Sequence, residues 1–156
     1  LEFRRVLFRS LCTQNVDNLH ERGGSTRVLH MHGEIAKARC HDCGALAPYD
    51  GDLSINLGCA ACGRTGGMRP HVVWFGETPL LMDEIYEALA AADLLFDRHI
   101  WKVYPAAGFV AAARSAGMPT MEINLEASEN AHLFDMGRYG KASDQVPAWV
   151  AEMVAL

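Results

Sequence analysis

Four cysteines form the pattern with the clearest chemical meaning in this sequence of 156 residues. Cys40 and Cys43 make one Cys-x-x-Cys pair, and Cys59 and Cys62 make a second pair after an insert of 15 residues. Two such pairs at this separation are typical of a zinc ribbon, in which four thiolates surround Zn²⁺ tetrahedrally. Because the protein would fill all four positions, the metal would stabilise the fold rather than meet a substrate. We therefore predict a structural zinc site in a small domain at residues 39–69.

Three other interpretations of these cysteines stay open. The four thiols could form two disulfides, they could remain unconnected in a core, or His41 could replace one sulfur as a ligand. The sequence contains five cysteines, so Cys12 is left over, and we expect no secretory signal. These features favour zinc, and a reducing, cytoplasmic location, over disulfide bonds.

The overall composition narrows the classes of partner. Half of the residues are hydrophobic and the net charge is −5, which suits one domain with a core plus the metal module. An acidic chain without a basic run is not expected to have nucleic acid or an anionic membrane as its main partner. The apolar stretch Ala88–Phe96 is interrupted by Asp93 and does not reach the length of a membrane span.

Polar side chains that could hold a ligand follow the first expected strand. Leu11–Thr13 is expected to be a strand, and the loop Gln14–Asn18 that leaves it carries amides and a carboxylate. In α/β sheets, the carboxyl ends of the strands are where ligand contacts occur. Next we expect a short helix at Asp17–Arg22 and strands at Val28–Met31 and Ile35–Ala38.

The second half of the chain has the pattern of helices around one further strand. We expect an extended segment at Val72–Phe75, followed by a helix that starts at Thr78 and runs to about Leu94. The remaining expected elements are a helix at Ala106–Ala116, a strand at Thr120–Leu125 and a helix from Pro147 to Val154. Short connections between these elements predict an α/β fold, with a parallel sheet covered by helices and the zinc ribbon inserted.

Several of these segments resemble motifs of the sirtuins, and in particular of bacterial sirtuins of the deacylase type. Around the paired cysteines, they occur in the family's order: Thr13–His20, His30–Glu34, Arg69–Glu77, Val103–Phe109 and Glu122–Glu126. Each motif is weak alone, but their order around a zinc ribbon is specific. The likeness covers nearly all of Leu11–Val154 apart from one block, and it implies a Rossmann-like NAD-binding domain.

Sirtuins remove acyl groups from protein lysines and consume NAD, so the resemblance implies this reaction here. Acetyl or succinyl groups would be removed from acylated lysine peptides, giving nicotinamide and O-acyl-ADP-ribose. His32 matches the family's general base, and an imidazole that titrates near neutrality suits that role. Considered without the resemblance, His32 could also be a packed or surface histidine. His30, two residues before His32, is expected to be structural.

The resemblance also implies contacts to NAD. Gln14, Asn15 and Asp17 match residues around nicotinamide and its ribose, and Asn124 matches a contact to the adenosine ribose. Amide and carboxylate groups suit carboxamide and hydroxyl partners. The alternative for the first three is a capped turn into the short helix, and for Asn124 a turn residue at a strand end.

A substrate-binding segment is implied in the same way. Val73, Phe75, Gly76 and Glu77 match the segment that pairs as a strand with the substrate peptide. Gly76 would permit close approach of the two backbones, and Val73 and Phe75 would wall the channel for the lysine methylenes. The alternative is an ordinary buried edge strand.

One departure from the family concerns the start of the chain. The family's Gly-Ala-Gly-x-Ser turn, which would approach the NAD pyrophosphate, is not matched, nor is the Tyr-x-x-Arg pair linked to acyl choice. Residues 1–10 read like a translated sequencing adapter and are expected to be foreign. The NAD-binding domain would then be partial, formed by residues 11–38 and 70–156, and we expect little catalysis from this chain by itself.

A second departure is the block Asp97–Lys102, which stands where the family has Ile-Gly-Thr-Ser-Gly. Charged residues contradict the apolar pattern of a buried parallel strand. One set of codons for this block encodes Ile-Gly-Thr-Ser-Gly when it is read one base later, so we expect a local frameshift that is restored before Val103. The alternative is a true replacement in which His99 and Lys102 form a new site, although burying unpaired charges is costly.

Two other functions stay open besides deacylation. The chain could be a non-catalytic zinc-ribbon module that binds a protein, or an NAD-dependent ADP-ribosyl transferase that uses the same NAD site. A binding module predicts zinc without coupling between NAD and acyl-lysine. Dependence of nicotinamide release on an acylated peptide would separate deacylation from ADP-ribosyl transfer.

Overall fold

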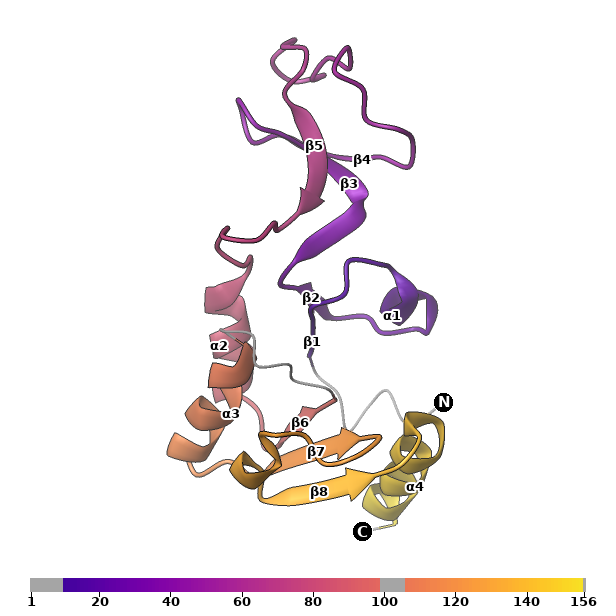
Figure 1. Ribbon diagram of the computed structural model, residues 1–156, viewed down its shortest axis with the longest axis vertical. Coiled ribbons are helices and arrows are strands. Elements are labelled where there is room, and N and C mark those ends of the chain that lie inside the picture. Colours follow the sequence, from indigo (N-terminus) through magenta and orange to yellow (C-terminus); the bar gives the residue numbers. More distant parts are fainter. Residues whose placement is uncertain (1–9, 99–105, 156) are drawn as a thin grey trace. The chain divides into compact units, whose positions relative to one another are not determined.

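The structure is a computed structural model that describes residues 10–98 and 106–155 (Figure 1). Contacts between Cα atoms divide the chain into two compact units, Leu1–Ile85 and Tyr86–Leu156. The grouping of residues 11–38 with 70–156 as one domain, separate from a ribbon at 39–69, stays a prediction. Most of the expected foreign segment, and His99–Lys102 of the expected frameshift, lie outside the described residues.

The first unit begins with a two-stranded parallel sheet. β1 (Leu11–Thr13) and β2 (Val28–His30) pair along their whole length, with Thr13 opposite His30. A parallel pair needs a crossover connection, and here it contains the short helix α1 (Leu19–Arg22). The loop Gln14–Asn18 therefore leaves the carboxyl end of β1, as predicted for a ligand-binding edge.

A three-stranded antiparallel sheet follows, with β3 (Gly33–Cys40) at its centre, β4 (Leu46–Pro48) on one side and β5 (Met68–Val72) on the other. The predicted run Ile35–Ala38 is thus the middle of a longer strand. The pairing of β3 with β5 runs from Gly33 opposite Val72 to Cys40 opposite Met68. The two long strands therefore connect the cysteine ribbon to the rest of the unit (Figure 1).

The prediction of an extended segment at Val72–Phe75 is only partly correct. The strand β5 ends at Val72, and the backbone of Val73 still pairs with His32, because its N–H donates to the His32 carbonyl at 2.9 Å. The chain then turns, since the Glu77 N–H donates to the Trp74 carbonyl at 3.0 Å. Phe75 and Gly76 are therefore at the tip of a turn rather than in a strand.

The next helix, α2 (Met82–Ala90), is shorter than the predicted one and does not start at Thr78. The Leu80 N–H donates to the carbonyl of Met31, the residue after β2, at 2.9 Å, which holds the segment before α2 in a non-helical form. Leu81 has a φ of 58°, and its carbonyl accepts the first helical hydrogen bond, from Ile85. A tertiary contact thus overrides the local helix-start signal.

The second unit is a parallel sheet with helices. β6 (Leu95–Asp97), β7 (Thr120–Asn124) and β8 (Met136–Tyr139) lie in that order, and all neighbours are parallel. Helices α3 (Ala106–Ser115) and α4 (Ala142–Val154) both contact the central strand β7. These observations confirm the predicted α/β class with a parallel sheet.

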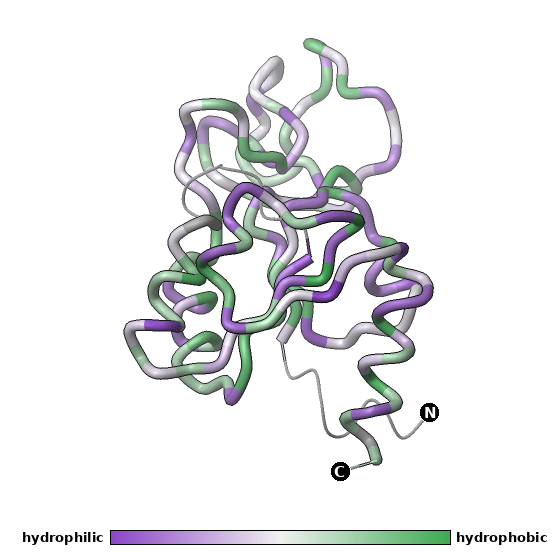
Figure 2. Tube along the Cα trace, turned by 60° about the horizontal axis from the view of Figure 1, so that its bottom comes forward, coloured by the Kyte–Doolittle hydropathy of each residue, from purple (hydrophilic) through white to green (hydrophobic). Residues whose placement is uncertain are grey.

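The first four residues of β7 are all buried, and its apolar residues form the core of the second unit. Met121 and Ile123 are buried against Trp149 of α4, whose ring stacks on Phe96 with centroids 5.2 Å apart. Val110 of α3 is 2% exposed. Figure 2 shows the hydropathy of the described residues along the chain, with hydrophobic residues in green and hydrophilic residues in purple.

Three elements of the second unit differ from prediction. Helix α4 begins at Ala142 rather than at Pro147, which lies inside it. The proline removes one backbone N–H donor, but the burial of Trp149 on the same helix favours the helical form through this point. The strand β8 and a short 3₁₀ helix at Ala131–Leu133 were not predicted, because neither segment has an apolar alternation.

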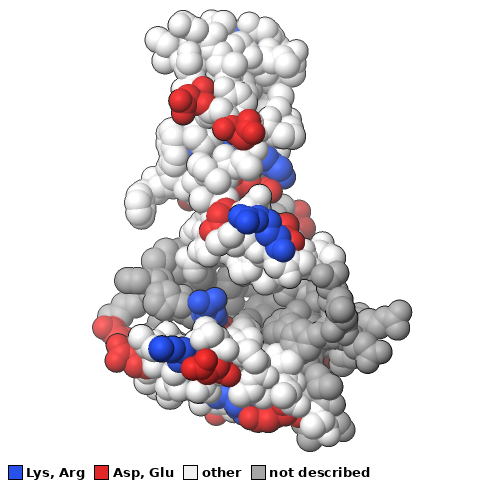
Figure 3. Space-filling view, turned by 90° about the vertical axis from the view of Figure 1, so that its right-hand side faces the viewer, with Lys and Arg blue, Asp and Glu red and all other residues white. Residues whose placement is uncertain are grey.

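The surface carries charges of both signs. On the face shown in Figure 3, the described Lys and Arg side chains are interspersed with Asp and Glu and form no continuous basic surface. No helix in the described part of the chain is both long enough and apolar enough to cross a lipid bilayer.

Candidate functional site

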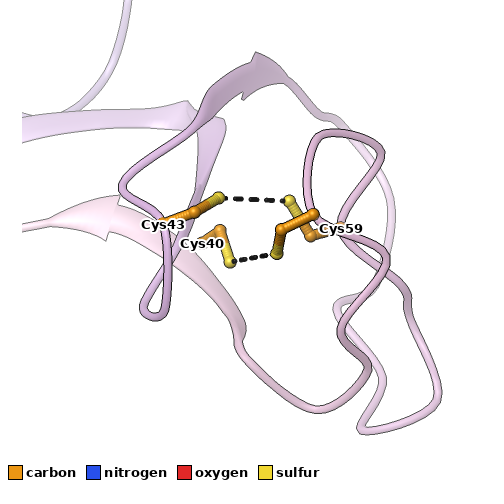
Figure 4. A group of neighbouring side chains, drawn as sticks. Cys40, Cys43 and Cys59 are labelled. Carbon is orange, nitrogen blue, oxygen red and sulfur yellow. Dashed lines mark hydrogen bonds between the residues drawn. The ribbon is translucent and has the colours of Figure 1, made fainter.

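The two Cys-x-x-Cys segments fold into two knuckles with the same hydrogen bonds. The Gly44 N–H donates to the Cys40 carbonyl at 3.0 Å, and the Gly63 N–H donates to the Cys59 carbonyl at 2.8 Å. Gly44 and Gly63 have φ angles of 74° and 73°, a conformation that glycine adopts without strain. The glycine after each second cysteine therefore lets the chain close each knuckle and direct two sulfurs inward (Figure 4).

The sulfur atoms of the four cysteines fit a zinc ion. They all lie within 4.8 Å of one another, with Cys40 Sγ 3.8 Å from Cys62 Sγ and Cys43 Sγ 3.7 Å from Cys59 Sγ. A tetrahedron with Zn–S bonds of about 2.3 Å has edges of about 3.8 Å. The predicted site at these four cysteines therefore has the size of a tetrahedral zinc site, which leaves no coordination position for a substrate.

The alternative interpretations of the cysteines do not match this geometry. A disulfide requires sulfurs about 2.05 Å apart, and all four cysteines are free thiols. The metal-binding cluster contains the four sulfurs and not His41, whose side chain is exposed.

In the predicted NAD and substrate region, the backbone of Met31 and His32, which follow β2, forms hydrogen bonds to the neighbouring segments. The Met31 N–H donates to the Thr13 carbonyl at 3.1 Å, and the Ile35 N–H donates to the Val16 carbonyl at 2.8 Å. The loop Gln14–Asp17 therefore runs beside His32 and is held at both of its ends. On the other side, the His32 carbonyl accepts from Val73. The structure thus brings three of the predicted site segments together.

The buried residue His30, which precedes Met31, has a structural role, as predicted. His30 is 6% exposed, and its Nε2 lies 2.7 Å from Glu21 Oε1 while its Nδ1 lies 3.2 Å from the Asn15 carbonyl oxygen. The hydrogen bond with His30 lowers the pKa of Glu21. His30 thus connects α1 to the Gln14–Asp17 loop and fixes the loop's backbone.

The side chains in the loop differ in what they contact. Asp17 Oδ1 accepts from the Leu19 N–H at 2.9 Å, as in the alternative of a capped turn. The Asn15 N–H donates to Thr13 Oγ1 at 3.0 Å, while the Asn15 side chain is exposed. Gln14 and His32 are half-buried. The loop backbone is therefore fixed, and one oxygen of Asp17 already has a partner.

Arg69, which was not among the predicted site residues, holds the turn after β5. Arg69 donates to both carboxylate oxygens of Glu77, at 2.5 Å and 3.0 Å, and its guanidinium carbon lies 3.6 Å from the centre of the Trp74 ring. The hydrogen bonds from Arg69 lower the pKa of Glu77 from 4.5 to about 2. Phe75 is fully exposed and Val73 is half-buried. Glu77 thus contacts the protein itself.

In the second unit, Asn124 lies at the carboxyl end of β7, as predicted. Its Oδ1 accepts from the Leu125 N–H at 2.8 Å, which is the turn contact of the alternative interpretation. Glu122, two residues earlier and therefore on the same face, is 1% exposed and its Oε2 accepts from the Tyr139 hydroxyl at 3.3 Å. The burial of Glu122 was not predicted, because nothing in the sequence indicates it.

The fold and the cysteine site define a class: an α/β protein with parallel strands and an inserted four-cysteine ribbon. The sequence pattern of the Sir2 family matches residues 3–97 of this chain. The chain is 59% identical over 146 residues to an NAD-dependent protein deacylase of Caulobacter vibrioides, covering 93% of this chain and 61% of that protein. It is 49% identical over 146 residues to an NAD-dependent protein deacylase of Leishmania major, covering 92% of this chain and 60% of that protein.

Solved structures agree with these matches. A Sir2 homologue crystallised with NAD has a TM-score of 0.83 at 30% identity, over 95% of this chain and 59% of that one. A Sir2 protein bound to a myristoylated histone peptide has a TM-score of 0.72 at 31% identity, over 92% of this chain and 64% of that one. This chain belongs to the Sir2 family, and it spans about three-fifths of the length of these relatives.

Proposed function

We propose that this protein removes acyl groups from lysine side chains of other proteins in an NAD-dependent reaction that gives nicotinamide and O-acyl-ADP-ribose. The observation that carries the proposal is the set of backbone hydrogen bonds at Met31 and His32, which holds the Gln14–Asp17 loop and the Val73 segment on either side of His32. Membership of the Sir2 family supplies the chemistry, since relatives are named NAD-dependent protein deacylases.

His32 is proposed as the general base. In this reaction the acyl oxygen displaces nicotinamide from the ribose of NAD, and a ribose hydroxyl must then lose a proton. His32 is half-buried and lies between the loop assigned to NAD and the segment assigned to the peptide. Histidine is the side chain that most often serves as a general base in enzymes.

The NAD contacts are proposed to come from amide and carboxylate side chains that lie at or after the ends of parallel strands. Gln14, Asn15 and Asp17 would bind nicotinamide and its ribose, and the backbone of their loop is held by hydrogen bonds to Ile35 of β3 and to His30. The exposed Asn15 amide suits the nicotinamide carboxamide, which has both donors and an acceptor. Asn124, at the carboxyl end of a parallel strand, would bind the adenosine ribose.

The acylated peptide is proposed to lie along the segment from Val73 to Glu77. The exposed ring of Phe75 offers an apolar wall for the lysine methylenes, and Val73 lies next to the backbone of His32. Gly76 has a φ of 85° and no atom within 4 Å of a Cβ position, so a peptide backbone can approach it. A myristoylated histone peptide binds to a Sir2 protein of similar fold.

The zinc ion is proposed to have a structural role. Cys40 and Met68 are paired across β3 and β5, so the ribbon fixes the end of the strand that leads to the Val73 segment. The free cysteines agree with a reducing, cytoplasmic location, which we propose as well.

The test begins with the natural gene, sequenced upstream of Leu11 and across Asp97–Lys102. An unbroken frame through Lys102 would refute the expected frameshift. The protein expressed from that gene is then assayed for nicotinamide release with an acetyl-lysine or succinyl-lysine peptide. We expect release that depends on the acylated peptide and falls at least about a hundredfold in His32→Ala. Release that is independent of the peptide favours ADP-ribosyl transfer, and zinc binding without any release favours a binding module.

The 156-residue chain is tested alongside it by isothermal titration with NAD and by the same peptide assay. We expect little turnover from this chain by itself. Turnover near that of a whole relative would refute this expectation.

A further inference from the structure

We propose that Arg69 and Glu77 form a clamp that sets the shape of the turn Trp74–Glu77 and thereby positions the acylated peptide. Both are positioning residues that act through the turn. The inference rests on the proposed function, because it takes this turn to be the peptide-binding segment. It changes the role expected for Glu77, which resemblance alone assigned to the substrate.

The clamp begins with a bidentate ion pair. Arg69 Nη1 donates to Glu77 Oε1 at 2.5 Å, and Arg69 Nη2 donates to Glu77 Oε2 at 3.0 Å. Two parallel bonds between a guanidinium and a carboxylate fix an orientation as well as a distance. The Arg69 side chain is 13% exposed and that of Glu77 is 35% exposed, so water screens the pair only partly.

The same two side chains also hold the backbone of the turn. Arg69 Nη2 donates to the Val72 carbonyl at 2.8 Å, and Glu77 Oε2 accepts from the Trp74 N–H at 2.9 Å. The guanidinium of Arg69 lies over the Trp74 ring, where a cation–π interaction adds to the hydrogen bonds. The clamp therefore contacts the chain at Val72, two residues before the turn, and it contacts the turn itself at Trp74 and Glu77, its first and last residues.

Little else fixes the tip of the turn. Phe75 is fully exposed, and a Cβ at Gly76 would have no neighbouring atom within 4 Å. One backbone hydrogen bond closes the turn, from the Glu77 N–H to the Trp74 carbonyl. An exposed turn held by a single backbone bond would sample several conformations, so the side-chain clamp limits them before a peptide binds.

Glu77 has little capacity left for a substrate. Both of its oxygens accept hydrogen bonds from Arg69, and one of them also accepts from the Trp74 backbone. The peptide would therefore meet the backbone of the turn together with Val73 and Phe75. Changing Glu77 should weaken peptide binding by loosening the turn.

The first experiment measures amide hydrogen exchange at Trp74 and Glu77 by NMR in the 156-residue chain. In Glu77→Gln, which keeps the size of the side chain but not its charge, we expect both amides to exchange about tenfold faster. The matched control is Glu152→Gln, which breaks another Arg–Glu pair, with Arg138, in the other compact unit. It should leave exchange at Trp74 and Glu77 unchanged. Unchanged exchange in Glu77→Gln would overturn the clamp.

The second experiment uses the protein expressed from the natural gene and an acetyl-lysine peptide. In Glu77→Gln we expect the KM for the peptide to rise about tenfold, while the KM for NAD and kcat at saturating peptide change less than twofold. Arg69→Lys keeps the charge but loses the bidentate geometry, and its KM should be intermediate. An unchanged peptide KM would overturn the positioning role. If the unmodified protein shows no peptide-dependent nicotinamide release, the proposed function fails, and with it the positioning role, while the exchange result still decides whether the clamp exists.

Discussion

At the scale of single residues, Gly33 shows how closely the chain passes itself beside the proposed base. Gly33 has a φ of 81°, and a Cβ added there would lie 2.0 Å from the His71 carbonyl oxygen of the neighbouring strand. Only glycine can therefore follow His32 while β3 and β5 keep their pairing. The residue after the base is thus fixed by backbone packing.

We expect Gly33→Ala to lower the free energy of unfolding by about 3 kcal/mol or more, because a clash with backbone adds to the left-handed strain of about 1–2 kcal/mol. Gly44→Ala is the matched control, since Gly44 has a φ of 74° but no atom within 4 Å of its Cβ position. Urea denaturation measures both. Equal losses in the two variants would contradict the importance of the close approach.

The Glu77 carboxyl gives a prediction about pH. Its pKa is lowered from 4.5 to about 2 by hydrogen bonds from Arg69, so the folded chain holds the ionised form. The ion pair therefore stabilises the turn fully above pH 4.5 and is lost as pH falls toward 2. Between pH 5 and pH 4, the Glu77 side-chain carboxyl ¹³C resonance should stay at its ionised shift. In Arg69→Gln it should move toward the protonated shift, and an identical titration in both proteins would contradict the assignment.

The site residues that could be predicted from the sequence are those whose spacing alone determines a geometry. Two Cys-x-x-Cys pairs determine a tetrahedral site wherever the ribbon lies, and the structure places the four sulfurs accordingly. The role of Arg69 could not be predicted, because it depends on a turn that brings Arg69 and Glu77 together. Resemblance indicated that Glu77 matters but not which group it contacts.

At the scale of elements, the sequence predicted most strands and helices but misplaced two helix starts. Thr78 and Pro147 each carry a local helix-start signal. In the first case, the bond from Leu80 to Met31 delays the helix, and in the second, burial of Trp149 extends the helix before the proline. Both errors come from contacts between residues distant in sequence, which a local pattern does not contain.

The prediction for the ribbon concerns its zinc content. We expect one zinc ion per chain by elemental analysis, reduced below about 0.2 per chain in Cys62→Ser. Cys12→Ser is the control, because Cys12 lies in β1, outside the four-sulfur cluster. Loss of zinc in the Cys12 variant, or full retention in the Cys62 variant, would contradict the assigned ligands.

At the scale of the whole molecule, the division into two compact units predicts that loss of zinc acts locally. Treatment with a chelator should speed amide exchange in the ribbon residues between Cys40 and Met68, which include β4 and the four cysteines of the metal-binding cluster. Exchange in β6, β7 and β8 should stay within about twofold, because their core of Met121, Ile123 and Trp149 contains no metal ligand. Hydrogen-exchange mass spectrometry before and after chelation measures both, and a uniform rise across the chain would contradict the division.

Because Cys40 pairs with Met68, the chain enters and leaves the ribbon at two neighbouring residues of adjacent strands. A segment of this kind can be exchanged as a unit, because its length and sequence can change while the flanking strands keep their spacing. Ribbons of other lengths, grafted between these two residues, should therefore leave the β3–β5 pairing at Gly33 and Val72 intact, as nuclear Overhauser contacts between the two strands can show. Such grafts would vary the outer surface of the protein independently of the backbone around His32.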